Sequence, residues 1–155
     1  MPTEIDWVRL AAFIDGEGMI DIHTHRQFRK DLGRLHETLY VRIIIVNTDP
    51  RLALWCKNTF GGTANLDRKS NPKWRNCLKW YCSSKKAAEI LRGCLPYFLL
   101  KREQAELALI FQETVTHSMG RKGHTPETHN RRLDIQQKMK LLKRAQSIPS
   151  DYIVH

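Results

Sequence analysis

The sequence predicts an α+β fold with the element order α-β-β-α-β-β-α, followed by two C-terminal helices. Three observations predict it: apolar residues at helical spacing, segments that alternate as half-buried strands do, and Gly, Pro and Asn signals between them. Two successive α-β-β blocks indicate one curved antiparallel sheet of four strands with helices on one face. No change of composition divides the chain, so we expect a single domain over residues 1–155.

The first block begins with a helix over residues 7–15, for which Asp6 is the predicted cap and Gly16 the stop. Its core-facing residues are predicted to be Trp7, Leu10, Phe13 and Ile14. From residue 19 the side chains alternate, which predicts a strand with one apolar and one polar face. The apolar face carries Ile20, Ile22 and Thr24, and the other face carries Met19, Asp21, His23, His25 and Gln27. A second strand is predicted over residues 38–46, after the charged loop QFRKDLGRLH.

In the second block, Asp49-Pro50 begins a helix over residues 50–59 that Gly61-Gly62 ends. Two strands are expected over residues 62–69 and 73–82, linked by Ser70-Asn71-Pro72. Three helices complete the chain: one capped by Ser84 that stops near Pro96, one over residues 98–116, and a basic one over residues 126–146. We assign Trp55, Trp74 and Trp80 to the core.

The charge of the chain indicates a polyanionic partner. Lysine and arginine number 26 against 16 acids, for a net charge of +10. Such a balance favours nucleic acid; a membrane surface is the rival, and a protein merely kept soluble by its charge is the third possibility. No segment pairs a basic face with a strongly apolar one, so we expect no membrane partner. A small-molecule substrate is not expected either.

The cysteines, the apolar runs and the N-terminal sequence indicate the cellular compartment of the protein. The four cysteines form no C-x-x-C pair, which is typical of reduced thiols in an intracellular protein. No apolar run approaches the length of a membrane span, and the N-terminus lacks a signal-peptide pattern. An organelle (chloroplast or mitochondrion) and the bacterial cytoplasm remain equally compatible with the sequence.

The stretch LAAFIDGEGMI, residues 10–20, places Glu17 between two glycines where a helix ends. The C-terminal end of a helix is partly negative, so a carboxylate there is unfavourable unless a cation binds. Mg²⁺ prefers oxygen ligands and accepts few from the protein, and the Glu17 carboxylate with the Gly16 carbonyl would suit it. The alternative is an ordinary solvated acid on the surface.

The stretch L-A-A-F-I-D-G-E-G resembles the signature of the LAGLIDADG homing endonucleases, and its single copy resembles the homodimeric, single-motif branch of that family. The resemblance extends over residues 7–146. Three further segments support it: V-N-T-D-P at 46–50, L-P-Y-F-L-L-K at 95–101, and T-P-E-T from residue 125.

The resemblance implies a site built by two chains. Motif helices of two subunits would pack together, bringing two Glu17 carboxylates to the twofold axis beside the scissile phosphates. The implied interface residues are Val8, Ala11, Ala12 and Asp15, with Ala12 standing where the family often has glycine. Asp15 is interpreted as a structural residue that bonds backbone at the opposing helix end, rather than as a metal ligand.

The same resemblance implies roles for three more residues. Lys101 matches the active-site lysine, an electrostatic partner of the phosphate or the attacking water. Asn47 matches a polar residue that orders water near the metal, and Arg51 a basic residue at the periphery of the site. The implied cofactor is Mg²⁺ held by Glu17 and Gly16, and Mn²⁺ or Ca²⁺ can occupy the same place.

The polar sheet face and one loop are the expected contacts with double-stranded DNA. The face carries Asp21, His23, His25, Gln27, Arg29, Arg42, Asn65, Asp67, Lys69, Arg75 and Lys79. The loop HSMGRKGH carries Arg121, Lys122 and His124 just before a helix start, an arrangement that suits phosphates. His23 and His25 also have the spacing of two zinc ligands on one strand, but no further ligands are evident, which favours DNA contact.

We therefore expect a site-specific, divalent-metal-dependent endonuclease that cuts double-stranded DNA as a homodimer, in the manner of intron homing. The target would be nearly palindromic, and cuts across the minor groove would leave 3′ overhangs, as the resemblance implies. Two alternatives stay open: a maturase that binds intron RNA, and a DNA-binding protein that does not cleave. Glu17 and Lys101 are both present, which argues against these two.

Overall fold

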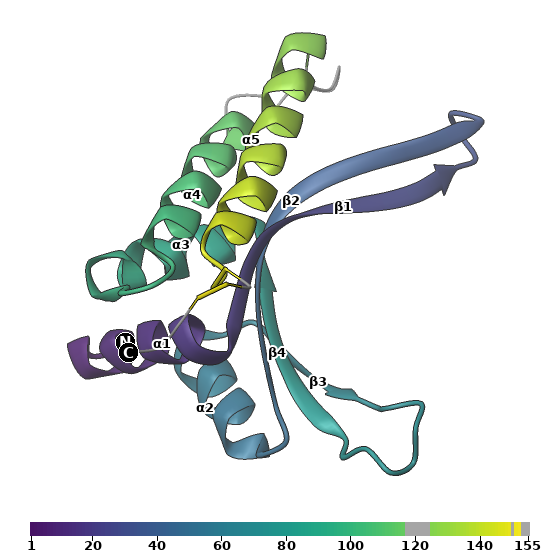
Figure 1. Ribbon diagram of the computed structural model, residues 1–155. Coiled ribbons are helices and arrows are strands. Elements are labelled where there is room, and N and C mark those ends of the chain that lie inside the picture. The colour runs from purple at the N-terminus through teal and green to yellow at the C-terminus, as the bar shows by residue number, and fades with distance from the viewer. Residues whose placement is uncertain (117–124, 150, 153–155) are drawn as a thin grey trace.

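The computed structural model describes residues 1–116, 125–149 and 151–152. The predicted α+β fold is confirmed: a four-stranded antiparallel sheet in the order β1-β2-β4-β3 carries helices on one face (Figure 1). The first block comprises α1 (Glu4–Glu17), β1 (Gly18–Arg29) and β2 (Arg34–Asn47). The second comprises α2 (Pro50–Phe60), β3 (Thr63–Asp67), β4 (Cys77–Ser83) and α3 (Ser84–Cys94). A 3₁₀ turn η1 (Leu95–Tyr97), α4 (Arg102–Thr116) and α5 (Pro126–Ala145) follow.

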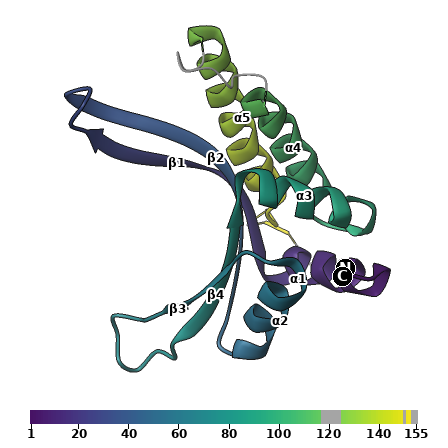
Figure 2. The ribbon, with the colours of Figure 1, turned by 180° about the vertical axis from the view of Figure 1, so that it is seen from behind.

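Both ends of the sheet reach well beyond the helices, and the sheet curves so that its open face is concave. The β1–β2 and β3–β4 hairpins project from opposite ends of this face, whereas the helices lie together behind it (Figure 1). The reverse view shows the same division (Figure 2). The loop residues Arg121, Lys122 and His124 lie outside the described part of the chain.

The first helix is longer at both ends than its sequence pattern predicted. Thr3, not Asp6, is the N-cap; the Thr3 side chain accepts from the Asp6 backbone, and the Asp6 carboxylate accepts from the Thr3 N–H at 2.9 Å. This reciprocal capping box explains why an acid three residues into the helix imitates a cap in the sequence. The helix also passes through Gly16 and ends at Glu17, because Gly16 keeps helical geometry and Gly18 turns into β1.

The alternation predicted for β1 is confirmed, but the hairpin is longer than predicted. Ile20 and Ile22 are buried under the helices, and β1 pairs with β2 without interruption from Gly18 to Arg29. Most of the charged segment taken for a loop is therefore strand, with the turn confined to the residues around Gly33, whose φ is +61°. Charge misled the prediction because a projecting hairpin has solvent on both faces, so its strands need no apolar side.

The core lies between the helices and the sheet, and Trp80 is the largest fully buried side chain among the described residues. Trp80 is fully buried, and its indole N–H donates to the Gly61 carbonyl at 2.8 Å. Trp55 packs at the margin of the core against Phe60, as predicted in outline. Trp74 is not a core residue: 63% of it is exposed, because β4 begins only at Cys77 and leaves Trp74 in the loop before it.

Two other boundaries differ from prediction. Ser83, not Ser84, occupies the N-cap position of α3, and Ser84 has a positive φ of 52°. The segment after Pro96 is not helical at once; the 3₁₀ turn intervenes, and α4 begins at Arg102. Within the described residues, none of the helices is both long enough and apolar enough to cross a membrane.

Candidate active site and nucleic-acid interface

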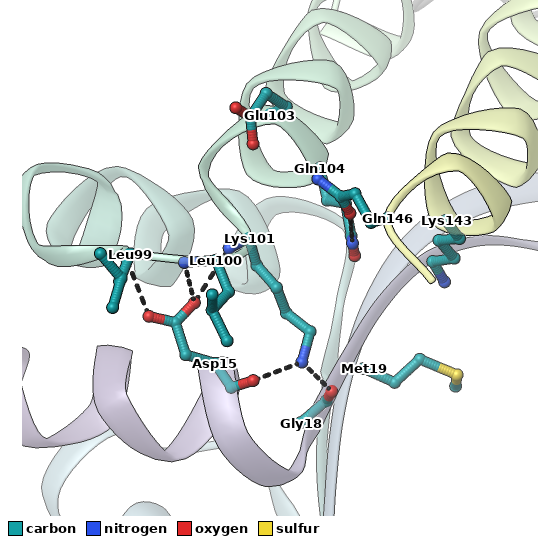
Figure 3. Close-up of a pocket in the computed structure, with 10 residues that line it drawn as sticks. All are labelled: Asp15, Gly18, Met19, Leu99, Leu100, Lys101, Glu103, Gln104, Lys143 and Gln146. Carbon is teal, nitrogen blue, oxygen red and sulfur yellow. Dashed lines mark hydrogen bonds between the residues drawn. The ribbon is translucent and has the colours of Figure 1, made fainter. Parts of the chain in front are cut away.

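The end of α1 is fixed to the start of α4 by two reciprocal sets of hydrogen bonds (Figure 3). The Asp15 carboxylate accepts from the backbone N–H groups of Leu99, Leu100 and Lys101, which lead into α4. The Lys101 ammonium donates to the carbonyls of Ile14, Asp15 and Gly18 at 2.7–3.0 Å. An acid thus holds the entrance of one helix, and a cation neutralises the negative end of the other.

Asp15 bonds backbone, as predicted, but the backbone is that of Leu99, Leu100 and Lys101 in its own chain and not that of an opposing helix end. Lys101 also differs from the expectation that its ammonium faces a phosphate or water, because the ammonium faces backbone carbonyls at the end of α1. All three ammonium protons have carbonyl acceptors in this structure, so the charge stands behind the end of α1. Burial lowers the Lys101 pKa from its ordinary value, and the nearby Asp15 carboxylate opposes that shift.

Beside the junction lies a cavity of about 710 Å³ that includes a lysine not foreseen from the sequence. Lys143, in the last turn of α5, lines it together with Lys101 and Met19 (Figure 3). Burial is the main cause that lowers the Lys143 pKa, while Asp21 raises it and Arg42 lowers it further. Only the packing of α5 on β1, through Gln136 and the Ile22 carbonyl, reveals this proximity.

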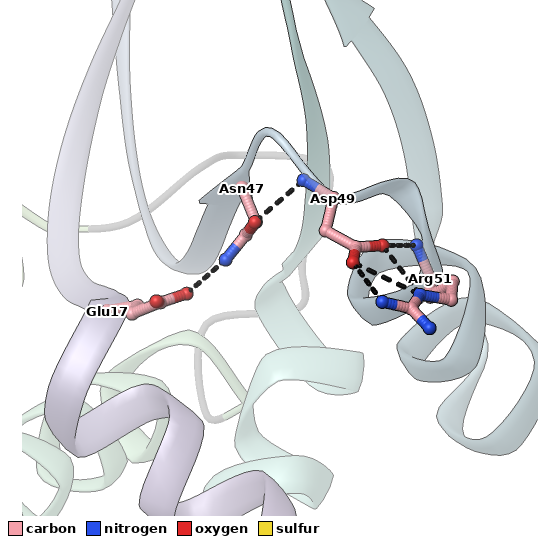
Figure 4. A network of polar contacts seen from close by, with 4 residues as sticks. All are labelled: Glu17, Asn47, Asp49 and Arg51. Carbon is pink, nitrogen blue, oxygen red and sulfur yellow. Dashed lines mark hydrogen bonds and ion pairs between the residues drawn. The ribbon is translucent and has the colours of Figure 1, made fainter.

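Glu17 and Asn47 meet at the C-terminal ends of α1 and β2 (Figure 4). The Glu17 side chain is exposed, and its Oε2 accepts from Asn47 Nδ2 at 2.7 Å. Asn47 Oδ1 in turn accepts from the Asp49 backbone N–H at 2.7 Å. Both ends of one amide are therefore used, one to orient the carboxylate and one to fix the turn into α2.

Arg51 joins the same network through Asp49, a residue that sequence reasoning treated only as a helix start. The Asp49 carboxylate caps α2 by accepting from the Arg51 N–H, and it also binds the Arg51 guanidinium, with the shortest contact at 2.6 Å. The guanidinium and the backbone bond hold the pKa of Asp49 at about 2. Glu17, Asn47 and Arg51 are thus connected residue by residue, while Lys101 approaches the end of α1 from another side.

The open sheet face gathers most of the residues expected to contact DNA. Because β1 alternates, Asp21, His23, His25 and Gln27 lie on the face opposite to the buried Ile20 and Ile22. The register places Arg42 opposite Asp21, and Asn65 opposite Lys79. Arg29 lies at the far end of β1, Asp67 ends β3, and Lys69 and Arg75 belong to the β3–β4 connection.

Two tyrosines whose orientation the sequence left undecided lie on the same open face. Tyr40 contacts His23 across the β1–β2 pair, with ring centroids 5.4 Å apart. Tyr81 alternates with the buried residues Trp80 and Cys82 and lies opposite Ile44 in the register. Both rings add aromatic surface to the face that carries the imidazoles.

Two of the carboxylates on this face are already paired with cations. The Arg42 guanidinium donates to both oxygens of Asp21 at 2.7 and 3.0 Å, and Lys69 binds Asp67 at 2.8 Å. The bonds to Asp21 raise the pKa of Arg42. A base contact through Asp21 or Arg42 would have to share or replace these bonds.

One face of α1 is open for contact with another molecule. Val8 and Ala12 are exposed at helical spacing, and a Cβ atom added to Gly16 would meet nothing within 4 Å. Ile5 and Phe13 of α1 are also exposed, and the exposed Leu99 and Leu100 bond to Asp15 near the C-terminal end of the helix. Ala11 does not belong to this open face, because it is completely buried in its own chain, where it packs with the core.

The oxygen donors at the end of α1 suit a divalent metal in part. Among the described residues, no group of three or more His, Cys, Asp or Glu side chains is placed to hold a metal ion. One chain therefore offers the exposed Glu17 carboxylate and the neighbouring Gly16 carbonyl. Such a hard, sparse donor set fits Mg²⁺, provided that water, phosphate or a second chain completes the coordination.

The fold is that of the LAGLIDADG homing endonucleases. No family model matches the sequence, and the search of curated proteins finds no match. Among solved structures, I-CvuI in complex with its target in the presence of Ca is similar with a TM-score of 0.69 and 17% identity, over 97% of this chain and 87% of that one. The archaeal intron-encoded I-Vdi141I, complexed with DNA, is similar with a TM-score of 0.68 and 12% identity, over 96% of this chain and 87% of that one. A double mutant of I-SmaMI is similar with a TM-score of 0.64 and 16% identity, over 97% of this chain but 51% of that one.

Proposed function

We propose that this protein is a site-specific, divalent-metal-dependent endonuclease that cuts double-stranded DNA as a homodimer, in the manner of intron homing. The observation that carries the proposal is the exposed Glu17 carboxylate at the end of α1, oriented by Asn47 and bordered by a concave, cation-rich sheet face. The DNA-bound endonucleases that share the fold support the same reading.

Each residue of the network has a stated part in the proposal. A divalent metal, when bound, supplies an activated water and neutralises charge at the phosphate. Glu17 and the Gly16 carbonyl would hold it. Asn47 keeps the carboxylate turned outward, Lys101 contributes positive charge at the end of α1, and Arg51 adds positive charge at the periphery. The other residues proposed for the site bind and orient the DNA.

The surface around α1 supports homodimerisation. The stripe of Val8, Ala12 and Gly16 is apolar, exposed and uncovered by any other described element of the chain. A second copy would bury it by an isologous contact and would bring a second Glu17 to the axis. The lengths of the similar structures are compatible with a dimer. This chain covers 87% of the I-CvuI chain but 51% of the I-SmaMI chain, so two copies of it would match the length of I-SmaMI.

The test is cleavage of a plasmid library that carries randomised sites, with Mg²⁺ or Mn²⁺ present. We expect a small set of related sites to be cut on both strands and to leave 3′ overhangs. Glu17→Gln should abolish cleavage while binding to the selected site is retained, because the carboxylate holds the ion rather than the bases. Glu106→Gln, an exposed acid on α4, is the matched control and should cut normally.

Normal cleavage by Glu17→Gln would show that the site is assigned to the wrong residue. Sequence-specific binding without cleavage by the unchanged protein would instead favour the DNA-binding alternative. Preferential binding to structured RNA over duplex DNA would favour the maturase.

A further inference from the structure

The loop between β3 and β4, residues 68–76, exposes the one tryptophan among the described four that does not pack against the core. Trp80 is buried at 0% exposure, and Trp7 and Trp55 pack against the core, whereas Trp74 is 63% exposed. A large aromatic ring left in water forgoes the favourable burial that its apolar surface would give. Neither the network around Glu17 nor the sheet face makes use of it.

The loop holds a defined shape instead of leaving Trp74 at a frayed end. Asn71 Oδ1 accepts from the Lys73 N–H at 3.0 Å, and the Asn71 carbonyl accepts from the Trp74 N–H at 3.0 Å. At the base of the loop, Asn76 Oδ1 accepts from the Lys69 N–H at 3.2 Å. Two asparagine residues therefore fix the turn that presents the indole, and ordering the ring on binding would cost little further backbone entropy.

The surroundings of Trp74 are cationic. Arg68, Lys73 and Arg75 are exposed, and none of them forms an ion pair within the described part of the chain; only Lys69 is neutralised, by Asp67. The loop lies at the tip of the β3–β4 hairpin, at the end of the concave face opposite to the β1–β2 tip (Figures 1 and 2). A flat apolar ring flanked by free cations can pack on the sugars and base edges of a groove while the charges meet the backbone phosphates.

We propose that Trp74 is a DNA-contacting residue whose indole packs on sugars and base edges in the groove at the outer end of the bound duplex. The inference rests on the proposed function, because it takes DNA to lie along the concave face. Scattered exposed apolar residues are ordinary on protein surfaces. What distinguishes Trp74 is the coincidence of a large ring, a hydrogen-bonded turn, unpaired cations on both sides and a position at the limit of the proposed DNA surface.

The experiment is a titration of tryptophan emission with a random-sequence DNA duplex, long enough to span both hairpin tips, at low salt. The wild-type protein should lose emission on binding, because close contact with nucleobases quenches indole fluorescence. Trp74→Phe should bind within a few fold of wild type but lose that part of the quenching. Trp74→Ala should bind about 5- to 30-fold more weakly, because the apolar contact area of the ring is lost.

Two controls keep the result interpretable. Leu66→Ala removes another exposed apolar side chain of the same hairpin and should bind as wild type does. The thermal midpoint of Trp74→Ala should equal that of wild type, since the ring supports no core. Equal quenching in Trp74→Phe, or unweakened binding by Trp74→Ala, overturns this inference alone. Failure of the wild-type protein to bind duplex DNA overturns the proposed function as well.

Discussion

Asn47 is the residue whose side chain connects the proposed metal-binding acid to the rest of the protein. Its Nδ2 donates to Glu17 and its Oδ1 accepts from the Asp49 N–H. Asn47→Leu keeps much of the side-chain volume but removes the donor, so the carboxylate loses its orientation. A hydrogen bond to a charged group contributes about 1.5–3 kcal/mol, which predicts a loss of cleavage rate of about tenfold to a hundredfold.

Single-turnover cleavage of a selected site measures this loss, and DNA affinity measured alongside should stay near wild type. Asn58→Leu makes the same chemical change at an exposed position of α2, away from the network, and serves as control. Wild-type cleavage by Asn47→Leu would mean that Glu17 needs no such partner.

At the scale of elements, the junction of α1 and α4 depends on one carboxylate. Asp15 accepts three backbone N–H bonds at the entrance of α4, and Asp15→Ala leaves those groups without their acceptor. We predict that the free energy of unfolding falls by about 2 kcal/mol. Asp15→Asn, which retains one acceptor oxygen, should lose less. Urea denaturation measures both losses.

Asp134→Ala is the matched control for the junction. Asp134 is exposed and pairs with Lys138 one helical turn away, so its removal should change the unfolding free energy by less than about 0.5 kcal/mol. Equal losses for the two alanine variants would contradict the capping role of Asp15.

The elements themselves could be predicted from periodicity, whereas several of their ends could not. Alternation found the buried Ile20 and Ile22, and Asp49-Pro50 and Thr125-Pro126 marked helix starts correctly because their caps are local. The alternation predicts too short a β1–β2 hairpin, because the distal part of the hairpin is solvated on both faces and has no apolar side. The sequence analysis assigns Trp74 to the core because tryptophan is usually buried, although Asn71-Pro72 predicts a turn close to it.

The candidate site could be predicted only in part for a related reason. Glu17 stands out through its two flanking glycines, and the resemblance supplied Asn47, Arg51 and Lys101. No local pattern shows that Lys143, far along the chain, shares a cavity with Lys101. Nor does any pattern show that Lys101 donates to the carbonyls at the end of α1, since that depends on how α4 packs.

At the scale of the whole molecule, the exposed stripe of α1 predicts the oligomeric state. Ala12 lies at the middle of the stripe, between Val8 and Gly16, so a long charged side chain there would keep two helices apart. Ala12→Arg should be monomeric and inactive but still folded, as its circular dichroism spectrum should show, because Ala12 is exposed in the single chain. Sedimentation at micromolar concentration measures the change from dimer to monomer. A folded, active Ala12→Arg monomer would contradict the dimeric architecture.

A twofold molecule should read its target twice, and Gln27 offers the sharpest test of that expectation. Gln27 is exposed near the tip of the β1–β2 hairpin, opposite His36, on the face that carries His23 and His25. A glutamine can pair with adenine through both ends of its amide, and such a contact discriminates by about 1–3 kcal/mol against the wrong base. Gln27→Ala should therefore relax specificity at one position in each half of a nearly palindromic site, symmetrically, without changing the metal dependence of cleavage. Sequencing the sites cut from a randomised library measures this, with Gln137→Ala, an exposed glutamine on α5, as control. Relaxation in only one half of the site, or evenly at all positions, would contradict the twofold reading of DNA by this hairpin.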